Sequence, residues 1–260
     1  MKSTTTTLPR LLIGALLLGA LFIGPGCVAP AQAQNPMANV QPLPASDGAA
    51  PELNAFLKAD QKQLPPPGAV LFMGSSSIRL WSTLASDFPE LPVINRGFGG
   101  SQIFESTLYA DRIAAPYKPK LIVMFAGTND LDYGNKSPAQ VLQEFKDFAA
   151  KIHTLLPDTR IAYISISPTR SRWKEEGAVL EANYLIQRYM IETNSPAQKL
   201  SFLDAHSALL TTDGQPPVNL ERPDGLHFNA AGYKVWTSLL KPRILALADL
   251  EGVKRLDAPK

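Results

Sequence analysis

Four short segments of the chain carry side chains suited to acyl transfer: a serine run at 74–77, a glycine-rich run at 95–101, Asn-Asp within 127–130, and Asp224 with His227. A serine hydroxyl becomes an effective nucleophile when an imidazole takes its proton. That imidazole is oriented by an acceptor on its second ring nitrogen, which an aspartate three residues away can supply. Backbone N–H groups and an Asn amide can stabilise the negative charge on a carbonyl oxygen. These residue types together indicate hydrolysis of an ester or a related acyl bond.

The order of these segments resembles that of the SGNH hydrolases, also called the GDSL-like lipase and esterase family. The resemblance covers about residues 71–236 in four separated motifs, and residues 72–81 look most similar to a bacterial branch akin to platelet-activating-factor acetylhydrolase and carbohydrate acetylesterases. Many members have Asp before the nucleophile, where this chain has Ser75. The resemblance implies five site residues: Ser76 as nucleophile, Gly100 and Asn129 as oxyanion donors, and Asp224 with His227 completing the triad.

Each segment taken alone has a simpler explanation as a turn or a helix cap, so the catalytic interpretation depends on all four occurring in this order. One rival dyad exists, Asp204 with His206 at the end of a strand, for which structural hydrogen bonding is the alternative. His153 lies in the last turn of an expected helix and is interpreted as a surface residue. The three histidines show no metal-ligand spacing, and neither a metal nor an organic cofactor is expected.

Two residues after the fourth expected strand are candidates for substrate binding. Arg172 and Trp173 belong to a loop at 167–173 that should reach the same rim, where the Trp ring can stack on a sugar. A plain surface-loop role for both residues remains open. The polar segments 101–106 and 170–175 are expected to wall the pocket.

The charge balance excludes one large class of partner. The chain has 25 Lys and Arg against 23 Asp and Glu, a formal net charge of +2, and the only charged residues before position 35 are Lys2 and Arg10. A neutral remainder gives no electrostatic basis for binding nucleic acid or anionic lipid. A single Cys excludes a disulfide framework and a multi-cysteine metal site.

The first 33 residues are predicted to be a signal peptide. Residues 11–24 form an apolar run that is short for a membrane span, and Ala31-Gln-Ala33 supplies the small-x-small pattern of a cleavage site. Cys27 offers the alternative of a lipoprotein, and an uncleaved anchor is a third possibility. In each case the protein is exported, to the periplasm or beyond, and we expect no integral membrane span in the mature chain.

The rest of the chain predicts one α/β domain over 51–250, preceded by a Pro-rich tether at 34–50 and followed by a tail at 251–260. Continuous apolar runs predict parallel strands buried on both faces. The expected strands are 69–73, 91–94, 121–125, 161–166 and 200–203, and the expected helices are 52–62, one capped by Ser137, 175–192, and 230–247 with a kink at Pro242. This alternation predicts a flavodoxin-like, three-layer α/β/α sandwich with a five-stranded parallel sheet.

The expected activity is hydrolysis of a short-chain ester, acetyl first, of a carbohydrate or lipid-like alcohol. A lysophospholipase or thioesterase with the same triad is the alternative enzyme, and a non-catalytic carbohydrate-binding protein of the cell envelope is the alternative outside enzymes. The expected partner is a small-molecule or glycan ester, while the oligomeric state stays open.

Overall fold

The computed structural model describes residues 1–3, 35–193 and 198–256. The signal peptide predicted over 1–33, its cleavage site and Cys27 lie outside these residues, apart from the first three. Among the described residues, no helix has both the length and the apolar character needed to cross a membrane.

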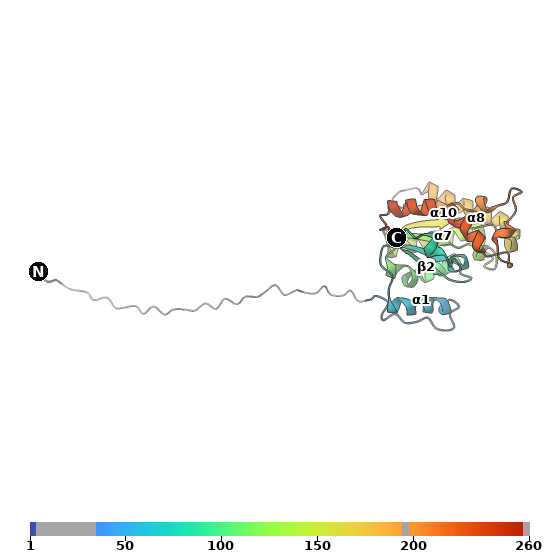
Figure 1. Ribbon diagram of the computed structural model, residues 1–260. Helices are drawn as coiled ribbons and strands as arrows, with labels where there is room; N and C mark the ends of the chain where they lie inside the picture. The colour runs from blue at the N-terminus through green and yellow to red at the C-terminus, as the bar shows by residue number, and fades with distance from the viewer. Residues whose placement is uncertain (4–34, 194–197, 257–260) are drawn as a thin grey trace. The chain divides into compact units, whose positions relative to one another are not determined.

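Five parallel strands form a single sheet in the order β2-β1-β3-β4-β5 (Figure 1). Their bounds are β1 Val70–Gly74, β2 Val93–Gly97, β3 Leu121–Phe125, β4 Arg160–Ile164 and β5 Leu200–Leu203. Every residue of β1 and β3 is buried, because these strands lie inside the sheet with helices over both faces. The predicted five-stranded parallel sheet is therefore confirmed.

Helices cover both faces of this sheet, which confirms the predicted three-layer α/β/α sandwich. One face packs against α1 Ala50–Lys62, α5 Ala110–Ile113, α7 Pro138–Leu155 and α8 Glu176–Glu192. The other face packs against α2 Ser76–Arg79, α3 Leu84–Asp87, α9 His206–Leu209 and α10 Ala230–Leu250. The remaining helices are α4 Ile103–Leu108 and α6 Thr128–Leu131, with 3-10 turns η1 Ala115–Tyr117, η2 Arg170–Glu175 and η4 Val218–Leu220.

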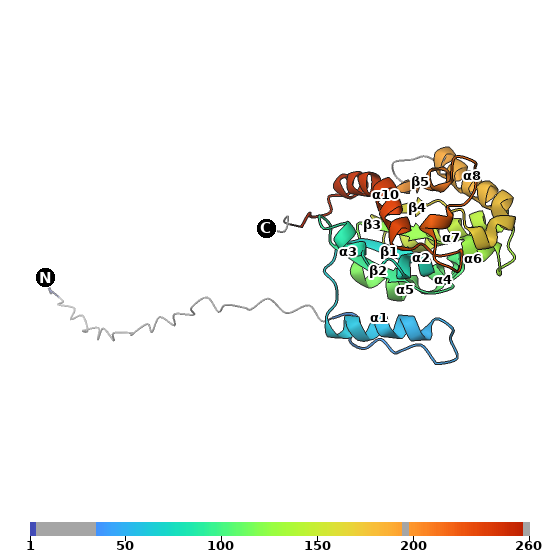
Figure 2. The same cartoon turned by 45° about the vertical axis from the view of Figure 1, so that its right-hand side comes forward.

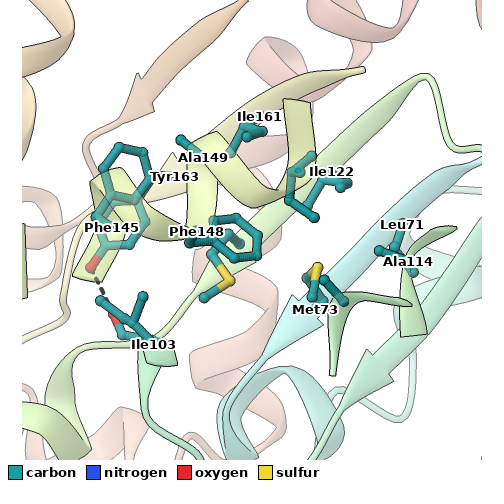
Figure 3. Packing of buried hydrophobic residues seen from close by; sticks show 14 of the residues in the cluster. Leu71, Met73, Ile103, Ala114, Ile122, Phe145, Phe148, Ala149, Ile161 and Tyr163 are labelled. Atoms are coloured by element: carbon teal, nitrogen blue, oxygen red, sulfur yellow. Dashed lines mark hydrogen bonds between the residues drawn. The ribbon is translucent and has the colours of Figure 1, made fainter. Parts of the chain in front are cut away.

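Alternate residues of the central strands supply the two apolar layers. Leu71 and Met73 of β1 enter the layer under α7, together with Phe145 and Phe148 of that helix (Figure 3). Phe72, between them in the sequence, belongs to the opposite layer. Side chains that alternate across a strand produce this division.

A capping signal in the sequence sets the start of the long helix α7, and a proline inside the long helix α10 does not end that helix. Ser137 caps α7, its hydroxyl accepting the Gln140 N–H at 3.3 Å while the Gln140 side chain accepts the Ser137 N–H at 2.8 Å. This reciprocal pair is the capping box that the sequence predicts. Pro242 lies inside α10, which continues to Leu250.

Residues 35–49, which belong to the predicted Pro-rich tether, lie against α1 (Figure 2). The Asn35 side chain donates to the carbonyl of Asp60 at 2.7 Å. Asn54 accepts the Leu43 N–H at 2.7 Å and donates to its carbonyl at 2.9 Å. Met37 is buried as well. Proline content favours an extended chain but does not reveal such side-chain anchors.

An ion pair joins α1 to the sheet. The Asp60 carboxylate, almost fully buried, accepts from the Arg96 guanidinium of β2 at 2.6 Å. The Tyr117 hydroxyl bonds both Asp60 and Arg96. A buried carboxylate of this kind needs such partners to offset its lost hydration. The network therefore holds α1 next to the carboxyl end of β2.

Candidate active site

Ser76 stands at a sharp turn between β1 and α2. Gly74 has φ +125°, and a Cβ there would lie 2.0 Å from the carbonyl oxygen of Phe125. Only glycine fits, because the conformation and the close approach both exclude a side chain. The Ser75 N–H then bonds the Phe125 carbonyl at 2.9 Å, which fixes Ser76 as the first residue of α2 at the carboxyl edge of the sheet.

A continuous hydrogen-bonded chain joins Ser76, His227 and Asp224. Ser76 Oγ lies 2.8 Å from His227 Nε2, and His227 Nδ1 lies 2.8 Å from Asp224 Oδ2. The other carboxylate oxygen, Oδ1, accepts the backbone N–H groups of Leu226 and His227 at 2.9 and 3.0 Å. The carboxylate is thus held by its own turn, and the imidazole is held between the carboxylate and the serine hydroxyl.

The charge state of Asp224 suits this arrangement. Burial raises the pKa of its carboxyl, but hydrogen bonds from His227 and Leu226 outweigh that effect and bring the pKa down to about 2. The carboxylate is therefore charged at any pH near neutrality. A charged acceptor favours the tautomer with the proton on His227 Nδ1, which leaves Nε2 able to take a proton from Ser76.

Asn129 places a side-chain amide beside the serine. It is buried near the start of α6, after β3, and its Nδ2 donates to the carbonyl of Ser101 at 2.9 Å. Asn129 and Ser76 line the same pocket. An amide nitrogen carries two hydrogens, so one N–H remains for a ligand next to Ser76.

Gly100 precedes Ser101, the residue that anchors the Asn129 amide. Its φ is +70°, a conformation that favours glycine, and its backbone N–H has no acceptor among the described residues. The Ser101 hydroxyl is buried and donates to the carbonyls of Gly74 and Phe98 at 3.1 Å. The structure thus brings the loops that bear Gly100, Asn129 and Ser76 together at one edge of the sheet.

The pocket beside Ser76 is small and is lined by both hydroxyl-bearing and apolar residues. Its cavity volume is about 10 Å³, the size of about one water molecule. Its hydroxyl-bearing walls include Ser77, Thr128, Ser167 and Thr169, and its apolar walls are Phe125, Leu226 and Phe228. The Ser167 hydroxyl is buried with no hydrogen-bond partner in the described part of the chain. The sequence placed its loop at this rim but gave no reason to single out Ser167.

Arg172 and Trp173 both lie in η2, yet only Arg172 lines this pocket. The Arg172 guanidinium donates to Asn129 Oδ1 at 2.7 Å and pairs with Asp132 at 3.0 Å. Of the polar segments 101–106 and 170–175, Arg172 alone is a lining residue. The expected polar wall is therefore provided mainly by the hydroxyl groups of other loops.

Glu52 of α1 reaches the glycine-rich loop, a contact that no sequence signal predicts. Its carboxylate accepts the backbone N–H of Gly99, next to Gly100, and pairs with the Arg79 guanidinium of α2 at 3.0 Å. One side chain from the N-terminal segment thus joins the loop after β2 to the helix that begins at Ser76.

The rival dyad is not arranged for catalysis at Ser76. Asp204 Oδ1 accepts the backbone N–H of His206 at 3.0 Å and does not bond its ring. The His206 ring is buried, its Nε2 lies 2.9 Å from Glu176 Oε1, and burial lowers its pKa. His206 does not line the pocket that contains Ser76.

His153, the remaining histidine, lies away from the pocket that contains Ser76. His153 is partly buried rather than fully exposed, and its Nε2 lies 3.2 Å from the Thr159 carbonyl. Burial lowers the His153 pKa. Across the described ranges, no group of three or more His, Cys, Asp or Glu side chains is placed to hold a metal ion.

The parallel α/β/α sandwich thus carries a hydrogen-bonded Ser–His–Asp chain and a side-chain amide at the carboxyl edge of its sheet. The chain belongs to the GDSL-like lipase/acylhydrolase family, whose model matches residues 73–235. This membership confirms the resemblance seen in the sequence and makes the protein a hydrolase of ester bonds.

Solved structures with the same fold include bacterial and fungal proteins. A Streptococcus pneumonia protein, provisionally described as a platelet activating factor, is 21% identical, with a TM-score of 0.62 over 75% of this chain and 92% of that one. A GDSL-like lipase from Bacteroides thetaiotaomicron is 20% identical, with a TM-score of 0.60 over 75% and 97%. A carbohydrate esterase family 3 protein from Talaromyces cellulolyticus is 16% identical, with a TM-score of 0.55 over 70% and 98%. A search of curated proteins gave no significant match.

Proposed function

We propose that the protein is a serine esterase in which Ser76, His227 and Asp224 form the catalytic triad. The observation that carries the proposal is the unbroken chain of two 2.8 Å contacts from Ser76 Oγ through the imidazole to Asp224. His227 Nε2 takes the hydroxyl proton as Ser76 Oγ attacks the ester carbonyl. The imidazolium then returns the proton to the departing alcohol, which leaves an acyl-Ser76.

The second half of the reaction uses the same groups in reverse. His227 takes a proton from a water molecule, whose oxygen attacks the acyl-Ser76 carbonyl, and the proton passes to Ser76 Oγ as the carboxylic acid leaves. Asp224 stays ionised throughout, since its pKa of about 2 lies far below neutrality. Its part is to hold the ring and to stabilise the imidazolium.

The N–H groups of Asn129 and Gly100 stabilise the tetrahedral intermediate in this proposal. Both loops are anchored through Ser101, whose carbonyl accepts the Asn129 amide and whose hydroxyl bonds the Gly74 carbonyl. Donors fixed before the reaction need no reorganisation when the negative charge develops. Their fixed position supports a role for Gly100 and Asn129 as the oxyanion hole.

The acyl group that this site accepts is short, with acetyl first. The pocket beside Ser76 has a cavity volume of about 10 Å³. Hydroxyl groups of Ser77, Thr128 and Ser167 border it, and each buried CH₂ of a longer chain would gain only about 0.8 kcal/mol even against a dry apolar wall. A long acyl tail therefore finds little surface on which to bind.

The measurement is kcat/KM across p-nitrophenyl acetate, butyrate, octanoate and laurate. We expect the value to fall steeply beyond about four carbons, because apolar burial is what rewards chain length. A maximum at octanoate or longer would contradict the short-chain proposal and favour a lipase or lysophospholipase.

The alcohol part of the substrate is a carbohydrate or a lipid-like alcohol. The hydroxylated rim suits a polar leaving group, and the solved structures with this fold include proteins named as a carbohydrate esterase and as a GDSL-like lipase. A screen of acetylated sugars, acetylated lipid alcohols and acyl thioesters with purified enzyme separates these possibilities. Preference for a thioester would contradict the proposed substrate class.

Export through an N-terminal signal peptide is part of the proposed function. The apolar run at 11–24 and Ala31-Gln-Ala33 support cleavage after Ala33. The expected product begins at Gln34, lacks cysteine and is recovered with periplasmic or secreted proteins. Labelling with a palmitate analogue that disappears in Cys27→Ser would show a lipoprotein instead.

A further inference from the structure

We propose that Arg172 is a positioning residue that sets the orientation of the Asn129 amide toward the oxyanion. This inference rests on the proposed esterase function and assigns Arg172 a role other than the substrate contact that the sequence suggests. Arg172 comes from η2, after β4, whereas Asn129 lies near the start of α6, after β3. The contact therefore joins two separate loops at the rim of the site.

The partners of Asn129 allow only one orientation of its amide. Arginine has donors and no acceptor, so the atom 2.7 Å from Arg172 Nη1 must be the amide oxygen. The Ser101 carbonyl is an acceptor, so the atom 2.9 Å from it must be the amide nitrogen. The two contacts together fix which edge of the amide presents an N–H to the pocket.

Arg172 is itself held before any substrate binds. Its Nε pairs with Asp132 at 3.0 Å, and its guanidinium lies 5.9 Å from the centre of the Tyr133 ring. Only 13% of the Arg172 side chain is exposed. Asp132 follows α6 directly, so the guanidinium bridges the two ends of the short helix that carries Asn129. A planar guanidinium that two partners already hold loses little conformational freedom when it also orients the Asn129 amide.

The charge on Arg172 also acts on the amide itself. A hydrogen bond from a cation to the amide oxygen is stronger than one from a neutral donor. It draws electron density from the amide nitrogen and makes the remaining N–H a better donor to a developing oxyanion. Loss of Arg172 would leave the Asn129 oxygen without this partner and allow the amide to turn away from the productive geometry.

The test is a double-mutant cycle with an uncharged substrate, p-nitrophenyl acetate. Arg172→Met keeps much of the side-chain length and removes every donor. We expect it to lower kcat by about 10- to 100-fold with little change in KM, because a displaced group costs about this much. In the Asn129→Ala background the same substitution should lower kcat by less than about 2-fold, since groups that act as a unit are not additive.

Two further variants separate positioning from general structural damage. Arg172→Lys keeps the charge and a donor but not the fork, and should recover part of the lost kcat. Lys174→Met is the matched control: Lys174 lies in the same 3-10 turn, is 3.8 Å from Asp132, and has a side chain that is 72% exposed. We expect the control to keep kcat within about 2-fold, as an exposed ion pair contributes little. Melting temperatures of all variants are compared with the native protein.

The outcomes distinguish this inference from the proposed function. A rise in KM with unchanged kcat in Arg172→Met would show substrate binding, and equal losses with and without Asn129 would show that Arg172 acts independently. Either result overturns the inference. Full activity of Ser76→Ala would instead overturn the proposed function on which it rests.

Discussion

Ser76→Ala and His227→Ala should each reduce kcat for p-nitrophenyl acetate by about 10⁴- to 10⁶-fold, leaving little above the background rate. The nucleophile and its base act as one unit, so the loss of either removes the covalent route. The 2.8 Å contact between Ser76 Oγ and His227 Nε2 is the physical reason for expecting equal defects. The double variant should be no slower than either single variant.

The fold should survive both substitutions. Ser76 is only partly buried, and the described contacts of its hydroxyl consist of the bond to His227. Ser75→Ala and Ser77→Ala provide the matched controls in the same turn, and we expect both to retain most of the activity. A dead Ser75 or Ser77 variant beside an active Ser76→Ala would show that the nucleophile assignment is wrong.

Asn129→Ala should lower kcat by about 10²- to 10³-fold with little change in KM, the loss typical of removing one oxyanion donor. The Asn129 N–H donates its full hydrogen bond to the substrate's carbonyl oxygen only when negative charge develops on that oxygen. The substitution therefore hardly affects binding of the substrate in the ground state. Steady-state kinetics with p-nitrophenyl acetate measure both constants.

Asn129→Asp is the matched variant for this experiment. It keeps an oxygen facing Arg172 Nη1, which now donates to Asn129 Oδ1 at 2.7 Å, but removes the donor that faces Ser101 and the pocket. We therefore expect it to be at least as slow as Asn129→Ala. An effect confined to KM in either variant would make Asn129 a ground-state binding residue instead.

The inner strands of the sheet could be predicted from the sequence because they are buried on both faces. Parallel strands between two helical layers must be apolar throughout, and the run at 121–125 is β3 with the predicted bounds. The start of α7 could be predicted equally well, because a capping box is a local signal of four residues. The bounds of the edge strand β2 differ more from the prediction, since the strand is Val93–Gly97 rather than 91–94. Its half-buried Asn95 and Arg96 interrupt the apolar pattern from which the bounds were predicted.

The five expected site residues lie near the carboxyl ends of strands or on the turn before α10, where the order of the motifs placed them. What the sequence could not show is how the site is supported. The contacts of Arg172 with Asn129 and of Glu52 with Gly99 span more than 40 residues each. Such pairs depend on tertiary packing and leave no periodic or local pattern in the chain. The docking of residues 35–49 on α1 likewise depends on side-chain anchors that proline content does not reveal.

The most direct test of the account is to identify the residue that a fluorophosphonate probe labels. Intact-mass measurement and peptide mapping of the treated enzyme should find one adduct, on Ser76. His227→Ala should slow labelling strongly, because the hydroxyl loses the base 2.8 Å away. An enzyme that hydrolyses esters while Ser76 stays unmodified, or a protein that is neither labelled nor active on any ester, would contradict the account.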